Sequence, residues 1–234
     1  MKKNLSIALF LVFTMFFSLS TNAIAATGDS IIKYYTVNSY YGIGGSLVIP
    51  SNVSAANGNV INFQLGLADT VEAGVSFSSA GWKIFINTGY HACKANSNNT
   101  EVFCSKYWRS VPLTTQPAAG DVLNLKIVNN GNNTVSYFLN GTSVFNGYDW
   151  GNLPVYTSLP ATTKVKFMHI TSDFNGTTRY NNAEWKDIVL RANASGSVYT
   201  NWTSSIPRTS SHTNEGNFTI HSSFNPLKTS FQAH

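Results

Sequence analysis

The feature that most constrains the fold is a strict alternation of apolar and polar residues over residues 59–77. Two runs, 59–67 and 70–77, each place an apolar side chain at every second position. This period of two predicts two half-buried β-strands. Glu72 falls on the polar side of the second strand, among small side chains. That side is either a surface that holds a ligand or a plain solvated face, since antiparallel sheets commonly expose one side to water.

Short alternating segments bounded by Gly, Pro and Asn continue along the chain. No segment of ten or more residues beyond residue 25 carries the apolar stripe of a helix. In 82–87, Trp82 faces one side while Lys83 and Phe85 face the other, so we expect both sides of that strand to be partly covered. Nine or ten short strands predict an all-β, antiparallel two-sheet sandwich. The other predicted strands are residues 46–49, 121–128, 134–139, 142–145, 164–171, 182–190 and a short one at 217–221.

The first 25 residues have the features of an export signal. Two lysines precede the apolar run 5–19, which is too short to span a membrane comfortably, and Ala-Ile-Ala at 23–25 offers a small-x-small cleavage site. We therefore expect a secreted, extracellular protein with one domain over 26–234, whose part from about residue 192 is rich in Ser, Thr and Asn. No later apolar run is long enough for an anchor, so we expect no membrane contact once the leader is removed. We also expect a monomer.

The charge of the chain argues against nucleic acid as a partner. The formal net charge is +5, two of these charges belong to the leader, and only 11% of the residues are charged. A nucleic-acid footprint needs a concentrated basic stripe. A surface dominated by Asn, Ser, Thr and Gly with many aromatics instead suits polysaccharide or peptide partners.

Cys93 and Cys104 are the only cysteines, and in an exported chain such a pair predicts one disulfide bond. Closing this short loop would stabilise the fold by roughly 2–3 kcal/mol. The alternative, half of a metal site, lacks ligands because His91 is the only neighbouring candidate. No metal-binding or cofactor motif occurs elsewhere, so we expect no cofactor and no metal.

Four segments together resemble the eqolisins, the glutamic peptidases, over about residues 46–190. The resemblance implies a jelly-roll sandwich like that of the concanavalin A-like lectins and glucanases. The segments are Phe-Gln-Leu-Gly-Leu-Ala at 63–68, Val-Glu-Ala-Gly-Val-Ser-Phe at 71–77, Gly-Asp-Val-Leu-Asn-Leu-Lys at 120–126 and Asn-Ala-Glu-Trp at 182–185.

The resemblance also implies roles for three residues. It assigns Glu184 as the catalytic base that activates water, and it places Glu72 where the family has a glutamine that steadies the oxyanion. Glu72 departs from that pattern, because a glutamate can donate a hydrogen bond only while it is protonated. Gln64 stands where the family has a tryptophan in its cleft.

The scarcity of glutamate points to the same two residues. The chain has four glutamates, and two of them, Glu72 and Glu184, fall inside predicted strands, where carboxylates are unfavourable. We predict that both lie on one face beside Gln64 as an interacting pair. Such a pair supplies an acid next to a base, as in retaining glycosidases. The alternative is that each forms a cross-strand ion pair and does no chemistry, with Lys83, Lys126 or Lys186 as the partner.

The sequence also suggests roles for four further side chains. Trp82, Lys83 and Arg179 are candidate substrate contacts, through stacking or charge. His169 shares a strand face with Val165 and Phe167, which predicts a buried, hydrogen-bonded histidine.

Three functions remain open, because fold analogy does not choose among them: an acid hydrolase of peptides, a hydrolase of β-linked polysaccharide, and a non-catalytic carbohydrate- or cell-surface-binding module.

Overall fold

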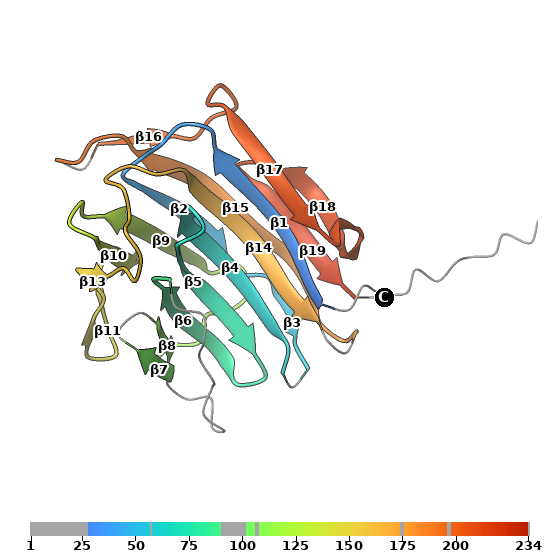
Figure 1. Ribbon diagram of the computed structural model, residues 1–234. Coiled ribbons are helices and arrows are strands. Elements are labelled where there is room, and N and C mark those ends of the chain that lie inside the picture. The colour runs from blue at the N-terminus through green and yellow to red at the C-terminus, as the bar shows by residue number, and fades with distance from the viewer. Residues whose placement is uncertain are drawn as a thin grey trace, which may run out of the picture.

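The structure is a computed structural model that describes residues 28–56, 58–89, 108–173, 176–195 and 198–233, and the backbone of 102–105. These residues form two antiparallel sheets and one two-stranded ribbon, β11 (Val144–Phe145) with β12 (Tyr148–Asp149) (Figure 1). Their only helical segment is a single 3-10 turn, Glu215–Asn217. Within the described ranges, no helix has the length and apolar character needed to cross a membrane.

The first sheet has eight strands and contains the hairpin predicted at residues 59–77. The hairpin strands pair in register, with Phe63 opposite Val75 and Leu65 opposite Ala73. In sheet order the strands are β17 (Arg208–Thr213), β1 (Gly28–Thr36), β14 (Val165–Asp173), β4 (Val60–Leu67), β5 (Val71–Ser78), β6 (Gly81–Asn87), β8 (Trp108–Pro112) and β7 (Val102–Ser105).

The second sheet has nine strands and is built around the longest strand of the protein. That strand, β15 (Arg179–Arg191), shifts its register against each of three partner strands, β19 (Leu227–Gln232), β2 (Gly42–Val48) and β3 (Ser51–Ser54). Seven strands run in the order β13 (Leu153–Pro154), β10 (Thr134–Leu139), β9 (Val122–Asn129), β2, β15, β19 and β18 (Phe218–Ser223), and β3 and β16 (Tyr199–Asn201) pair with β15.

The core lies between the two sheets and receives the apolar side of each alternating strand. Leu65, Ala73 and Val75 from the first sheet and Trp185 from the second are all fully buried. Trp185 donates a hydrogen bond from Nε1 to the carbonyl oxygen of Met168 in the opposite sheet, at 3.2 Å. Trp185 therefore reaches across the core, and the residues on either side of it in the strand point outward.

His169 confirms the prediction of a buried, hydrogen-bonded histidine. It is fully buried on β14, and its Nδ1 lies 2.6 Å from Oγ1 of Thr229 in the other sheet. Burial lowers the pKa of His169 to about 3, because the charged imidazolium would lose its hydration. The histidine is therefore a neutral part of the core and no candidate for a catalytic base.

The all-β antiparallel sandwich is confirmed, and the predicted bounds of the central hairpin agree with β4 and β5 to within about one residue. The segment after residue 192 contains more strands than the one predicted at 217–221, because it supplies β17 to the first sheet and β16, β18 and β19 to the second. The predicted leader lies outside the described residues, as do Cys93 and the side chain of Cys104, so the disulfide remains a prediction.

Candidate functional site

The outer face of the eight-stranded sheet carries the polar side of the central hairpin. Val71 and Ala73 point into the core and are fully buried, so Glu72 points outward. The strand pairing aligns these outward residues in rows across β1, β14, β4, β5 and β6. One row is Tyr35, Lys166, Gly66, Glu72 and Asn87, and the next is Lys33, Met168, Gln64, Gly74 and Phe85.

Lys166 ties Glu72 into a buried ion pair. Its Nζ lies 2.7 Å from Oε1 of Glu72 and 2.9 Å from Oδ1 of Asp69, while its own side chain is only 2% exposed. The side chains of Glu72 and Asp69 are 24% and 80% exposed. Gly66 makes room for the lysine, because a Cβ at that position would lie 2.5 Å from Cε of Lys166. Among the described residues these are the only ion pairs.

Tyr35 is hydrogen-bonded to this group of charged side chains. Its hydroxyl donates a hydrogen bond of 3.0 Å to Oδ1 of Asp69. Burial, together with the nearby carboxylates, raises the pKa of Tyr35 to about 12, although the positive charge of Lys166 acts in the opposite direction. The hydrogen bond from Lys166 lowers the pKa of Asp69, despite the opposing effect of burial. Lys166 thus holds both carboxylates in place and favours the ionised form of Asp69.

Gln64 lies next to Glu72, as predicted. It pairs with Gly74 across the β4–β5 ladder, so Glu72 is its diagonal neighbour on the same face. The Gln64 side chain is only 4% exposed, and its Oε1 is buried without a hydrogen-bond partner among the described residues. A buried amide oxygen in this state costs about 1–3 kcal/mol unless a donor reaches it, so Gln64 is a candidate contact for a ligand that supplies a donor.

Beyond Gln64, Phe85 and Lys83 complete the outer face on β6. The predicted partial cover on both sides of this strand is confirmed, since Phe85 is 4% and Lys83 is 6% exposed. Phe85 stacks on Trp108 of β8, with ring centroids 5.8 Å apart. Burial lowers the pKa of Lys83. Lys83 thus lies on the same face as Glu72, two rows away.

Trp82 is not a substrate contact, which corrects the expectation drawn from the sequence. Its side chain points into the core and stacks on Phe63, with ring centroids 6.2 Å apart, and it also packs on Phe77. The alternation had placed Trp82 and Lys83 on opposite sides correctly. What it could not decide was which side faces the core.

The predicted pairing of Glu72 with Glu184 is wrong. Glu184 lies on β15 of the other sheet, between the fully buried residues Ala183 and Trp185, and so points away from the core on the opposite side of the sandwich. Its strand neighbours are Val48 and Lys228. The two glutamates therefore point outward from opposite faces and cannot share a proton or a substrate.

Arg179, the remaining predicted contact, is exposed at the start of β15. Because it belongs to the nine-stranded sheet, the structure does not bring it together with Glu72 or Gln64. Its candidate role as a substrate contact therefore has no geometric link to the outer face of the first sheet.

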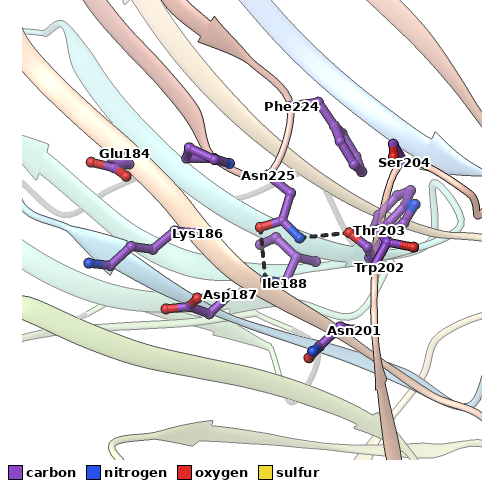
Figure 2. A pocket seen from close by; sticks show the side chains of 11 residues that line it. Glu184, Lys186, Asp187, Ile188, Asn201, Trp202, Thr203, Ser204, Phe224 and Asn225 are labelled. Atoms are coloured by element: carbon purple, nitrogen blue, oxygen red, sulfur yellow. Dashed lines mark hydrogen bonds between the residues drawn. The ribbon is translucent and has the colours of Figure 1, made fainter.

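Glu184 lines a pocket of about 590 Å³ beside β15 (Figure 2). Lys186 and Asp187 lie along the same strand, and the opposite wall comes from residues 201–204 and 224–226. Asn225 fixes these walls: its Nδ2 donates to the carbonyl oxygen of Trp202 at 2.7 Å, and its Oδ1 accepts from the backbone N–H of Ile188 at 3.2 Å. The described residues contain no cluster of three His, Cys, Asp or Glu side chains that could hold a metal ion.

Sequence reasoning missed Lys166, which organises the outer face of the eight-stranded sheet. The alternation of Val165, Lys166 and Phe167 did indicate that the lysine points away from the core. Nothing local indicated that β14 would lie beside β4, because that pairing joins segments about 100 residues apart in the sequence.

Known proteins match this chain by fold and not by sequence. No protein-family model and no curated protein matches it. The Scytalido-glutamic peptidase, solved with a peptide-based transition-state analog, superposes with a TM-score of 0.50 at 11% identity, covering 88% of this chain and 99% of that one. SCP-B, an eqolisin peptidase solved with the tripeptide Ala-Ile-His, has a TM-score of 0.48 at 10% identity, covering 90% and 100%. This chain therefore has an eqolisin-like jelly-roll fold.

Proposed function

We propose that this protein, acting outside the cell, binds an extended peptide across the outer face of its eight-stranded sheet, at Glu72 and Gln64. The observation that carries the proposal is the amide of Gln64, which is 96% buried with an Oε1 that has no hydrogen-bond partner among the described residues. A peptide offers an N–H donor at every residue and can satisfy such an acceptor once the groups that cover Gln64 Oε1 move aside.

The chemistry around Gln64 suits a peptide backbone. Gly74 has no side chain, and a Cβ there would collide with the carbonyl oxygen of Phe63, so between Gln64 and Phe85 only the buried backbone of Gly74 intervenes. Glu72 adds a carboxylate whose Oε1 is held by Lys166, while no described residue bonds its Oε2. The solved relative with the same fold holds a peptide-based transition-state analog, which supports a peptide over other polymers.

Peptide hydrolysis is the second candidate, and the placement of Glu72 next to Gln64 favours it. A carboxylate and an amide are the two groups that the eqolisin resemblance assigns to catalysis. In this chain Glu72 would accept a proton from the attacking water through Oε2, and the Gln64 amide would donate to the oxyanion through Nε2. The resemblance had put the glutamate on β15 and the glutamine on β5, so this assignment moves the glutamate role to β5 and the glutamine role to β4.

The structure does not support a glycosidase that uses Glu72 and Glu184 as a pair, since Glu184 lies on the other side of the sandwich. Asp69 is bonded to the same lysine as Glu72. Asp69 does not suit the role of a general acid, because the hydrogen bond from Lys166 lowers its pKa and favours its ionised form.

The experiment compares three variants with the wild type on acid-denatured casein and on a panel of insoluble glycans. Glu72→Gln and Gln64→Leu should each weaken retention of casein peptides about tenfold or more, as expected for the loss of a charge-assisted or buried hydrogen bond. Glu184→Gln is the matched control on the other face and should bind as the wild type does. Release of new peptide ends by the wild type and by Glu184→Gln, but not by Glu72→Gln, would add hydrolysis to binding.

Three results would overturn the proposal. They are no retention of casein peptides, equal loss in Glu184→Gln and Glu72→Gln, and retention on a glycan without retention of peptides. The last would make the protein a carbohydrate-binding module, the alternative left open by its sequence.

A further inference from the structure

A second pocket, of about 270 Å³, lies on the outer face of the nine-stranded sheet, away from Glu72 and Gln64. It spans β10, β9, β2 and β15, which are neighbours in the sheet (Figure 1). The residues that line it are Gly44, Gly45, Ser46, Asn124, Leu125, Lys126, Phe138, Gly141, Asp187 and Val189.

Glycine forms the floor of this pocket. Gly44 pairs with Lys126 on one side and with Val189 on the other, so it lies between two larger side chains. A Cβ at Gly44 would lie 3.3 Å from both Cγ2 of Val189 and the carbonyl oxygen of Leu125. The missing side chain leaves a hollow beside the Lys126 side chain.

Lys126 is the cationic group of the pocket, and no described carboxylate forms an ion pair with it. Its Nζ lies 4.3 Å from the ring centroid of Phe138 and 5.6 Å from that of Tyr199. In the described part of the chain it makes no ion pair and no hydrogen bond. Burial lowers the pKa of Lys126, and the nearby charge of Arg191 lowers it further. A partly buried ammonium beside a second cation is an unfavourable arrangement that an anion would relieve.

Neutral donors stand next to this ammonium. The Ser46 hydroxyl donates a hydrogen bond of 2.9 Å to Oδ1 of Asn124. This bond fixes the orientation of the Asn124 amide and leaves its Nδ2, which has no partner among the described residues, to donate elsewhere. An ammonium and an amide donor on a bare backbone floor together suit an oxyanion.

We propose that this pocket binds an anionic group, a carboxylate or a phosphate, with Lys126 as the counter-charge and the Asn124 amide as a second donor. The volume of the pocket fits one such group with a single sugar ring or a similarly sized carrier, and Phe138 offers an apolar face for the carrier. The site is independent of the peptide surface, because it lies on the opposite side of the sandwich.

Asp187 is the one carboxylate among the pocket's lining residues, and it opposes an anion there. It is exposed and has φ of 54°, a left-handed conformation that asparagine also adopts readily. Asp187→Asn should therefore keep the local backbone while removing the repulsion. The proposal requires that this variant bind anions more tightly than the wild type.

The test measures binding of two probes, inorganic phosphate and glucuronate, to the wild type by calorimetry at low ionic strength. Lys126→Met keeps most of the apolar stem and should weaken binding about tenfold or more, as the loss of a charge-assisted hydrogen bond predicts. Lys186→Met is the matched control, because Lys186 lies on the same sheet but outside this pocket, and it should change affinity by less than about twofold. Urea unfolding of each variant establishes that it is folded.

Each outcome decides for or against the site. Binding of phosphate alone, of glucuronate alone, or of both supports the pocket and identifies which oxyanion it takes, provided that Lys126→Met weakens it and Asp187→Asn strengthens it. No binding of either probe to the wild type, or equal losses in Lys126→Met and Lys186→Met, would overturn the proposal. Unchanged binding in a folded Lys126→Met variant would do so as well.

Discussion

Lys166 Nζ lies 2.7 Å from Oε1 of Glu72, and the lysine that makes this contact is almost entirely buried. The ion pair joins β14 to β5 across the width of β4. A buried ammonium of this kind persists only while its carboxylate partners stay in place, since an unpaired charge in such surroundings is costly. Glu72 is thus a structural partner as well as a candidate ligand contact.

Glu72→Gln should lower the free energy of unfolding by about 1–3 kcal/mol, because it leaves Lys166 with Asp69 as its only carboxylate partner. Glu184→Gln, which breaks no ion pair in the described structure, should cost less than about 0.5 kcal/mol. Urea unfolding at neutral pH measures both. In a double mutant with Lys166→Met, the loss should be smaller than the sum of the two single losses; full additivity would show that the pair is not coupled.

Asp69 should titrate below the ordinary aspartate range, because the hydrogen bond from Lys166 favours its ionised form and lowers its pKa. Its contribution to stability is therefore complete above about pH 4 and is lost as the pH falls through the lower folded pKa. Carboxyl NMR of the wild type and of Lys166→Met tests this. The pH midpoint of Asp69 titration should rise in Lys166→Met and remain unchanged in Lys186→Met. Identical midpoints in all three proteins would show that Lys166 does not lower the pKa of Asp69.

His169 should make folding sensitive to mild acid. Its pKa is about 3 in the folded state, against about 6.5 in an unfolded chain, so only the unfolded state takes up a proton between these values. His169 therefore has no effect on the pH dependence of the free energy of unfolding above about pH 6.5. Below that pH it lowers the free energy of unfolding by up to about 1.4 kcal/mol per pH unit. His169→Leu removes this titration, and Thr229 keeps its contact with the hydroxyl of Tyr180 at 2.9 Å.

The measurement is urea unfolding at pH 6.5 and at pH 4.5. The wild type should lose about 2 kcal/mol more than His169→Leu between these two conditions. His221→Gln, on the exposed side of β18, serves as the control and should behave as the wild type does. An equal loss in the wild type and in His169→Leu would mean that the histidine is accessible to protons in the folded state.

The strands, and the residues that share one side of each strand, could be predicted from the sequence because they are local properties. Alternation over a few residues identified β4 and β5 and showed that His169 shares a side with Phe167. The same pattern placed Gln64 and Glu72 on the polar side of one hairpin, and the structure keeps them adjacent because the hairpin connection is short.

The relation between Glu72 and Glu184 could not be predicted in this way. Alternation tells which residues share a face of a strand but not which sheet the strand joins. β15 lies between β2 and β19, whereas β5 lies between β4 and β6, and only long-range pairing decides this. The ion pair with Lys166 has the same origin, since it depends on β14 joining the sheet next to β4.

The most direct test of the central claim is amide NMR of the labelled protein during titration with a short peptide from denatured casein. We expect the side-chain amide of Gln64 and the backbone amides of Gly66 and Gly74 to shift as peptide is added, while those of Gly44 and Glu184 stay in place. Shifts confined to Gly44 and Glu184, or no shift at any of these positions, would contradict a peptide site on the outer face of the eight-stranded sheet.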